Sequence, residues 1–255
     1  MKIRTGIVSL VFASAMIFLF RGTSAAVIFS WSGAPIYGES PAYLPSGSAE
    51  FSVVGDQLII TLTNTSGGPL NHNWQVLTGL TWDMVDTDAS LAPVSAMLYN
   101  SVLISPSMPA ADISGEWGFK SDILAAGLGS YGISSVGDIL YGADTFGVND
   151  RIGSINISGP ASLNGVDFGI VGASFVPTLG TSKQGPFVQG INATAGSVRF
   201  TFNINGTLTE DNFSNVGALY GSSGAPVVPE PATLVLLGSG IFGLLAFRRI
   251  RRRNV

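Results

Sequence analysis

Three carboxylates in one short stretch are the clearest group of side chains that could bind a ligand. Asp83, Asp86 and Asp88 directly follow a run that alternates apolar and polar side chains. Carboxylate oxygens are the ligands that calcium prefers, but this stretch lacks the central glycine and the distal glutamate of an EF-hand loop. A solvated acidic loop is therefore the other interpretation. We expect no cofactor unless these three residues hold calcium.

Residues for nucleophilic or metal-assisted catalysis are scarce. The chain has no cysteine and one histidine, His72, which excludes thiolate chemistry and any site with two histidines. A Ser-His-Asp triad would depend on His72 alone, and no nucleophile-elbow motif accompanies it. Paired carboxylates could serve a glycan-acting hydrolase, although the sequence points to no particular pair. We predict that the protein is not an enzyme and assign no catalytic residue.

The N-terminal segment has the layout of a secretory signal. Lys2 and Arg4 precede an apolar run over residues 6–20, and small side chains follow up to Ala25 and Ala26. Signal peptidase needs small side chains at alternate positions, so we predict cleavage after Ala25 or after Ala26. The run is shorter than the roughly 20 residues of a membrane span, which disfavours an uncleaved anchor. We therefore assign the segment up to Ala25 to a signal peptide with a helical apolar part.

The C-terminal segment combines a proline motif, an apolar run and a basic cluster. Pro229, Glu230 and Pro231 precede 16 uncharged residues, from Ala232 to Phe247. As a helix this run is about 24 Å long at roughly 1.5 Å per residue, which makes a short transmembrane span. The basic cluster consists of Arg248, Arg249, Arg251, Arg252 and Arg253. By the positive-inside rule, these arginines keep the tail in the cytoplasm and everything before the helix outside.

This order of elements resembles a PEP-CTERM sorting domain. Proteins with such a tail are recognised in the inner membrane of exopolysaccharide-producing Gram-negative bacteria by an exosortase, a membrane transpeptidase-like protease, and passed to the cell surface. The resemblance implies that Pro229, Glu230 and Pro231 are the recognition element and that the arginines retain the helix until that encounter. A simple single-pass anchor, which needs the helix and the arginines but not the tripeptide, is the alternative.

The segment between the two ends also resembles an uncharacterised family of exosortase-dependent surface proteins. The resemblance rests on Leu62-Thr63-Asn64-Thr65-Ser66, on Gly165-Val166-Asp167-Phe168-Gly169 and on a last strand that runs from Asn215 to Gly221. It implies no activity and no catalytic residue.

The charge distribution limits the partners of this middle segment. Residues 26–228 contain 4 bases against 15 acids, which gives a net charge of −11. Such a surface repels nucleic acid phosphates, so we expect no nucleic-acid partner. The chain has 46% apolar and 11% charged residues, and this composition indicates a folded domain rather than disorder.

Alternating apolar side chains predict strands along this segment. The clearest signal is a hairpin over residues 50–65 with its turn at Gly55 and Asp56. In residues 197–204 the alternation is almost perfect, and we expect its apolar side chains in the core. Further strands are expected at residues 76–85, 92–99, 152–157, 166–171 and 174–176. Helices lack support except for one short turn at residues 121–126.

These features predict an all-β protein with one extracytoplasmic domain. We expect an antiparallel β-sandwich, jelly-roll or immunoglobulin-like, at residues 26–221, a linker at 222–228 and the sorting tail with its transmembrane helix at 229–255. The resemblance implies an exported structural or interaction protein, anchored in the inner membrane and then delivered to the cell surface or the extracellular matrix. Its expected partners are signal peptidase, exosortase and the inner membrane.

A carbohydrate- or calcium-binding module of an exopolysaccharide matrix is the alternative function. Among the tryptophans, Trp74 lies in a polar loop and is the better candidate for an exposed sugar-stacking ring. Trp82 lies in an alternating run and is expected in the core. A glycan-acting hydrolase ranks third.

Overall fold

The computed structural model describes residues 26–33, 45–67, 75–103, 111–139, 144–153, 168–174, 192–221 and 225–227. Within these ranges the chain forms short and long strands with few helical turns. The strands are β1 (Val27–Ser32), β2 (Ser46–Val54), β3 (Gln57–Asn64), β4 (Leu77–Met84), β5 (Ser90–Leu103), β6 (Gly118–Lys120), β7 (Tyr131–Ser134), β8 (Asp138–Ile139), β9 (Asp144–Thr145), β10 (Phe168–Val171), β11 (Asn192–Asn205), β12 (Phe213–Tyr220) and β13 (Ala225–Val227). The 3-10 turns are Ser114–Glu116, Val148–Asp150 and Glu210–Asn212.

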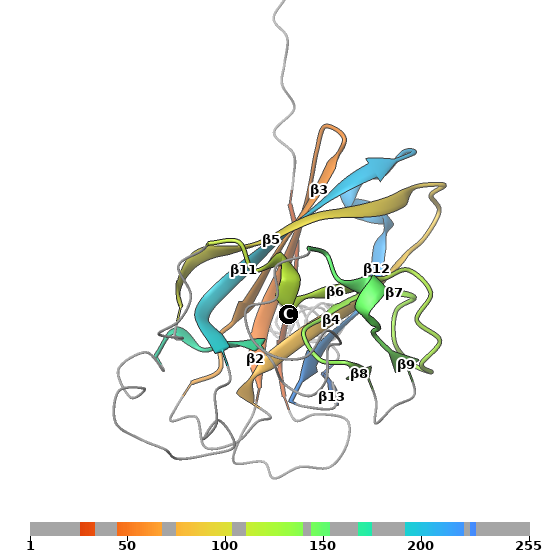
Figure 1. The fold of residues 1–255 in the computed structure, drawn as a ribbon. Coiled ribbons are helices and arrows are strands. Elements are labelled where there is room, and N and C mark those ends of the chain that lie inside the picture. The colour runs from red at the N-terminus through yellow and green to blue at the C-terminus, as the bar shows by residue number, and fades with distance from the viewer. Residues whose placement is uncertain are drawn as a thin grey trace, which may run out of the picture.

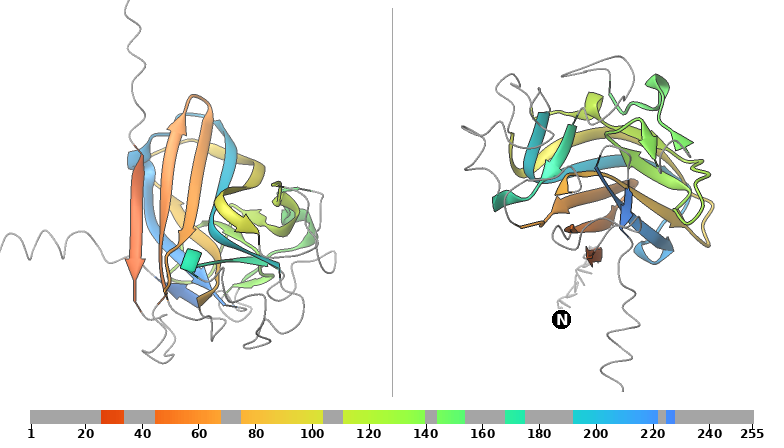
Figure 2. Two further views of the ribbon diagram at one scale, coloured as in Figure 1. Left: turned by 90° about the vertical axis from the view of Figure 1, so that its left-hand side faces the viewer. Right: turned by 90° about the horizontal axis from the view of Figure 1, so that it is seen from below.

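Most strands belong to one large sheet that bends back over itself (Figure 1 and Figure 2). This 11-stranded sheet has the order β1, β2, β3, β11, β10, β4, β12, β13, with β5 beside β11 and with β7 and β6 beside β4. β1, β2, β3, β11 and β5 form one layer, and β4, β12, β7 and β6 face it across the core. β10 pairs with both β11 and β4. The two layers expected as separate sheets of a sandwich are therefore parts of one sheet.

The pairing of β10 with β11 makes this sheet mixed. The two strands run parallel, from Phe168 beside Asn192 to Val171 beside Ala195, whereas the other strand pairs among the described residues are antiparallel. The prediction of an all-β protein is confirmed. The prediction that all strands run antiparallel is wrong for β10 and β11. Parallel neighbours are never joined by a tight turn. Local hairpin signals in the sequence therefore could not predict this pair.

The hairpin expected over residues 50–65 is confirmed as β2 and β3. Val54 pairs with Gln57 across a two-residue turn. Gly55 in this turn has a φ of 63°, a left-handed conformation that glycine adopts without steric cost. The alternation puts the even-numbered residues of β3 in the core and leaves the odd-numbered ones partly exposed.

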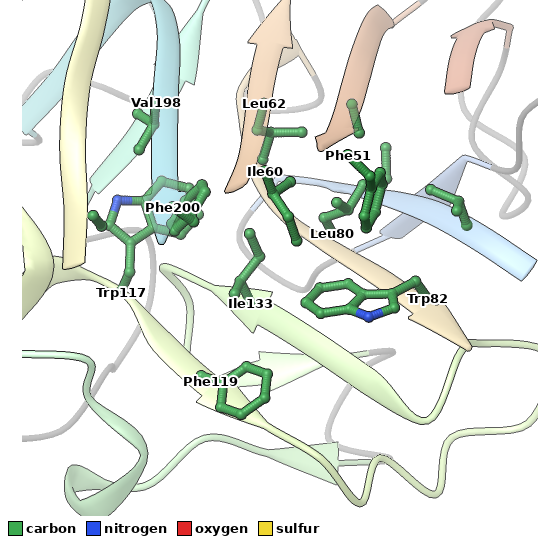
Figure 3. Close-up of a cluster of buried hydrophobic side chains, with 14 of the residues drawn as sticks. Phe51, Ile60, Leu62, Leu80, Trp82, Trp117, Phe119, Ile133, Val198 and Phe200 are labelled. Atoms are coloured by element: carbon green, nitrogen blue, oxygen red, sulfur yellow. The ribbon is translucent and has the colours of Figure 1, made fainter. Parts of the chain in front are cut away.

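The core between the two layers consists of large apolar side chains (Figure 3). Phe51 of β2 meets Trp82 of β4 edge to face, with ring centroids 5.8 Å apart. Trp117 meets Phe200 of β11 in the same way at 4.9 Å. In such pairs the positive edge of one ring lies against the negative face of the other. Trp82 is fully buried, as expected, and so are the apolar residues Val198, Phe200 and Phe202 of β11.

Residues 121–126 form an extended loop instead of the expected helical turn. Ile123 and Ala125 are buried, while Leu124 between them is 87% exposed. This period of two belongs to extended backbone. Both buried residues join Leu219 of β12 in a small second core. Burial of alternate side chains thus outweighs the helical propensity of the alanines.

The other expected strands agree in part with the structure. Residues 77–84 and 92–99 lie within β4 and β5, and residues 168–171 form β10. Ile152 lies in a bend, and Ser174 lies in a turn rather than a strand. Gly153 lies in the same bend, and residues 154–157, 175 and 176 lie outside the described residues.

The segment expected as a linker contains a strand. Ala225–Val227 forms β13, in which Ala225 pairs with Tyr220 and Val227 with Ala218. A strand of three residues is too short to show an alternating pattern in the sequence.

Asn64 is a buried residue that joins three parts of the sheet. Its side-chain amide donates hydrogen bonds of 2.7 Å to the carbonyl oxygens of Gln75 and Ile170, and its side-chain oxygen accepts one from the N–H of Ser66 at 2.9 Å. These bonds satisfy backbone groups where β3 ends beside β10, which explains an asparagine that is 1% exposed.

Candidate functional site

The predicted calcium ligand Asp83 serves as a hydrogen-bond acceptor. One of its carboxylate oxygens accepts bonds from the N–H of Ser130 at 2.7 Å and from the Ser130 hydroxyl at 2.9 Å. The other oxygen accepts a bond from the side-chain amide of Asn215 at 3.0 Å. Partial burial raises the pKa of Asp83, but these hydrogen bonds outweigh it and hold the pKa below its ordinary value. Asp83 therefore fastens β4 to the chain before β7 and to β12.

The other two predicted ligands have separate surroundings. Asp86 has a φ of 53° in the turn that follows β4. Asp88 accepts a hydrogen bond from the N–H of Thr207 at 3.2 Å. Among the described residues, no three acidic, histidine or cysteine side chains form a group that could hold a metal ion. Calcium binding by these aspartates therefore stays a prediction.

One layer of the sheet carries a row of hydroxyl groups on its outer face. The row crosses five strands, because strand register aligns Ser30, Ser48, Thr63, Ser197 and Tyr99. Directly opposed residues of antiparallel strands lie on the same face of a sheet. The hydroxyls of Thr63 and Ser197 are hydrogen-bonded at 2.8 Å. Figure 2, left, shows β1, β2, β3 and β11 side by side in that order.

This hydroxyl row ends in a shallow hollow at the β1 edge of the sheet. The hollow has a volume of about 480 Å³, within the roughly 300–1,000 Å³ of typical small-ligand sites. Its lining consists of Ser30, Trp31, Ser32, Ser46, Gly47, Ser48 and Thr65. Most of these residues carry a hydroxyl, which both donates and accepts hydrogen bonds. A polyhydroxylated ligand matches this chemistry.

Arg199 places a cation on the same face. It lies opposite Thr61 of β3 and Met97 of β5. Its guanidinium carbon lies 3.5 Å from the centroid of the Tyr99 ring, and its buried Nε has no hydrogen-bond partner. Stacking on an aromatic ring leaves the in-plane N–H groups of an arginine free to bind a ligand.

The tryptophans are used mainly in the core. Trp82 and Trp117 are fully buried and Trp31 is 4% exposed. Trp74, the candidate sugar-stacking ring, lies outside the described residues, as does His72.

The sheet ends close to the predicted sorting residues. β13 ends at Val227, and Pro229 follows two residues later in the sequence. Two residues of chain span at most about 7 Å, so very little sequence separates the sheet from the tripeptide. At the other end, Ala26 is exposed and directly precedes β1. The other predicted processing residues lie outside the described ranges: Ala25, Pro229, Glu230, Pro231, Arg248, Arg249, Arg251, Arg252 and Arg253.

Residues 227–253 match the PEP-CTERM protein-sorting motif. The chain carries a PEP-CTERM motif. This PEP-CTERM match includes the tripeptide and the arginine cluster and covers about a tenth of the chain. No curated protein and no solved structure matches the chain.

A PEP-CTERM motif implies processing by an exosortase. It also implies a protein that is anchored in the membrane and is then secreted or displayed on the surface. Within the described ranges, no helix is long and apolar enough to cross a membrane. The membrane helix predicted at residues 232–247 lies outside those ranges.

Proposed function

We propose that this PEP-CTERM protein is a structural or interaction protein of the bacterial surface, with no catalytic activity of its own. The observation that carries the proposal is the match of residues 227–253 to the sorting motif. Signal peptidase removes the segment up to Ala25 or Ala26, and the tail then holds the β-rich domain outside the inner membrane. Exosortase recognises Pro229, Glu230 and Pro231, removes the tail near them, and releases or attaches the domain outside the cell.

The arginine cluster has a defined part in this sequence of events. Five arginines after a short apolar helix resist transfer across the bilayer, so the chain stays in the membrane until cleavage. The chemistry of sorting belongs to the exosortase, and this chain supplies the extended, proline-bounded substrate. After cleavage nothing holds the domain in the inner membrane.

Intact mass spectrometry tests the proposal. The protein is recovered from membranes and from the medium of producing cells, with and without the exosortase gene. We expect loss of the tail near Pro229 only in cells with exosortase, and loss of the signal in both. A Glu230→Ala variant should keep its tail, while the neighbouring change Ala232→Ser should not affect processing. An intact tail in both strains would leave a simple membrane-anchored domain.

The hydroxyl row and its hollow favour a second candidate function, the binding of a neutral glycan. The supporting observation is the combination of the 480 Å³ hollow with the guanidinium of Arg199, which stacks on Tyr99 on the same face of the sheet. Hydroxyl and guanidinium groups together match the donors and acceptors of a polyol. The net charge of −11 over residues 26–228 disfavours a polyanionic glycan.

Affinity electrophoresis of the full chain tests glycan binding. The gels contain a panel of neutral polysaccharides, with alginate as the anionic comparison. We expect retardation by at least one neutral polysaccharide, and a loss of it in Thr63→Val and Arg199→Gln. Thr207→Val, an exposed change away from this face, is the matched control. Retardation by alginate alone, or equal retardation of all variants, would refute the assignment.

A further inference from the structure

The outer edge of β1 has backbone groups that find no partner among the described residues. Gly33 donates its N–H to the carbonyl oxygen of Pro45 at 3.1 Å, which fixes the odd-numbered residues of β1 as the ones that bond to β2. The N–H and C=O groups of Ile28, Ser30 and Ser32 therefore point away from β2. An edge of this kind can accept a further strand.

Some other edges of the sheet are covered in part within the described residues. β1 covers β2 only as far as Phe51. Past that point, the carboxylate of Glu210 accepts a hydrogen bond from the N–H of Val53 at 3.0 Å. The free side of β5 is covered by residues 111–114, because Leu98 donates to Ala111 at 2.8 Å and Ile113 donates to Ala96 at 2.9 Å.

Two further edges, those of β6 and β13, are blocked or short. Beside β6, Ile152 donates its N–H to the carbonyl oxygen of Trp117 at 2.8 Å. β13 has three residues, with Pro226 at its centre, and proline supplies no N–H to a neighbouring strand. β1 has six residues, and it has no proline, no bulge and no charged side chain.

We propose that β1 pairs edge to edge with β1 of a second copy of this chain. Residues 26–33 are uncharged in a segment whose net charge is −11, so pairing along this strand brings no like charges of β1 itself together. A two-fold axis at Ser30 sets Ile28 opposite Ser32 of the second copy. About six backbone hydrogen bonds then form, two for each hydrogen-bonded residue pair.

Side chains of β1 support a second copy as the partner. Val27 and Phe29 point to the core side but are only partly buried, because β1 is the last strand of its layer. In the two-fold pairing Phe29 lies opposite Trp31 of the second copy, and cross-strand aromatic pairs of this kind stabilise antiparallel strands. Ile28, which is 61% exposed on the other face, gains a neighbour as well.

Cysteine cross-linking tests this pairing, because the chain has no cysteine of its own. The variant Ser30→Cys sets two thiols opposite each other with a Cα separation of about 5.5 Å, within the range that a disulfide bridges. In Ser32→Cys the two thiols lie about 14 Å apart along the strands, too far for a disulfide. Both serines are exposed on the same edge, so the pair forms a matched control.

The full chain is oxidised in producing cells with copper phenanthroline and examined on non-reducing gels. We expect about tenfold more covalent dimer from Ser30→Cys than from Ser32→Cys, because only the first meets the disulfide distance. Adding Ile28→Lys to the Ser30→Cys chain should suppress the dimer, whereas Ile28→Val should not. Equal cross-linking of both cysteine variants, cross-linking to a different protein, or no dimer overturns the proposal. None of these outcomes depends on whether exosortase cleaves the tail.

Discussion

The indole N–H of Trp31 donates a hydrogen bond of 2.9 Å to the hydroxyl of Tyr220. This bond joins β1, near the predicted mature N-terminus, to the last residue of β12. The Tyr220 hydroxyl in turn donates to the carbonyl oxygen of Ser46 at 3.0 Å. Both rings are buried. These two hydrogen bonds therefore link β1, β2 and β12 through polar groups that lie inside the apolar core.

We expect Tyr220→Phe to lower the free energy of unfolding by about 1–3 kcal/mol, because it leaves the buried Trp31 N–H without its acceptor and removes one of the hydrogen bonds to the Ser46 carbonyl oxygen. Urea denaturation followed by fluorescence measures the change. Tyr131→Phe is the control, since Tyr131 is partly exposed. Equal losses in the two variants would show that the hydrogen bond adds no stability.

The stability that depends on Tyr220 should fall at high pH. Burial raises the pKa of Tyr220 well above its ordinary value, because the charged phenolate is poorly solvated in the core. The contribution is complete below the unfolded pKa of about 10 and is lost as the pH rises above it. Urea unfolding of the parent protein and Tyr220→Phe at pH 8 to about 11 should show the two converging. A constant difference would contradict this.

Gly47→Ala should destabilise the β1 edge. A Cβ at Gly47 would lie 2.6 Å from Cζ2 of Trp31 and 2.6 Å from the carbonyl oxygen of Thr63. Relief of these contacts displaces the indole or β1, at a cost of about 1–3 kcal/mol. Thermal unfolding measures the loss, and Gly33→Ala is the control because a Cβ there meets nothing within 4 Å. Similar midpoints for the two variants would refute this account of Gly47.

Asp83→Asn should reduce stability above pH 4 and should flatten the acid limb of the stability curve. The pKa of Asp83 is lowered in the folded state. Its contribution is therefore present above the unfolded pKa of about 3.9 and is lost as the pH falls through the folded value. Asp86→Asn is the matched control, because asparagine tolerates the left-handed φ of 53° at this position. Parallel pH profiles for the parent protein and Asp83→Asn would exclude the charged hydrogen bonds as the cause.

Calcium should leave the unfolding temperature unchanged. Asp83 is already engaged by Ser130 and Asn215, and Asp88 by Thr207, so binding would have to break these bonds. A ligand that binds only the folded state raises its stability. Differential scanning calorimetry with millimolar calcium, against a chelator control, makes the comparison. A rise that Asp86→Asn abolishes would establish the predicted calcium loop.

Local patterns predicted the strands whose two faces differ in polarity. The hairpin of β2 and β3 and the core side chains of β11 followed from alternation alone. In β1, Val27, Phe29 and Trp31 lie on one face, but the apolar Ile28 on the other face blurs the alternation, so this strand could not be predicted from the pattern. The parallel pairing of β10 with β11 was out of reach, because it depends on contacts between distant segments.

The hydroxyl row shows why the candidate site could not be predicted. Ser30, Ser48, Thr63 and Ser197 come from four strands, and only the register aligns them. A shift of one residue in any strand would turn its hydroxyls to the core face. The sorting motif, by contrast, is contiguous in sequence, so its residues could be named without a structure.

β13 also bears on the distance at which the proposed tail would hold the domain from the membrane. Its last residue, Val227, is hydrogen-bonded into the sheet only two residues before the tripeptide. A domain held by such a tail has at most about 7 Å of free chain between its sheet and the sorting motif. In the anchored state that we propose, so short a connection would restrict the tilt of the domain and would turn the end that carries β13 toward the lipid headgroups. The exosortase would then meet the tripeptide close to the folded sheet, and the sheet rather than a long linker would determine how the tripeptide is presented.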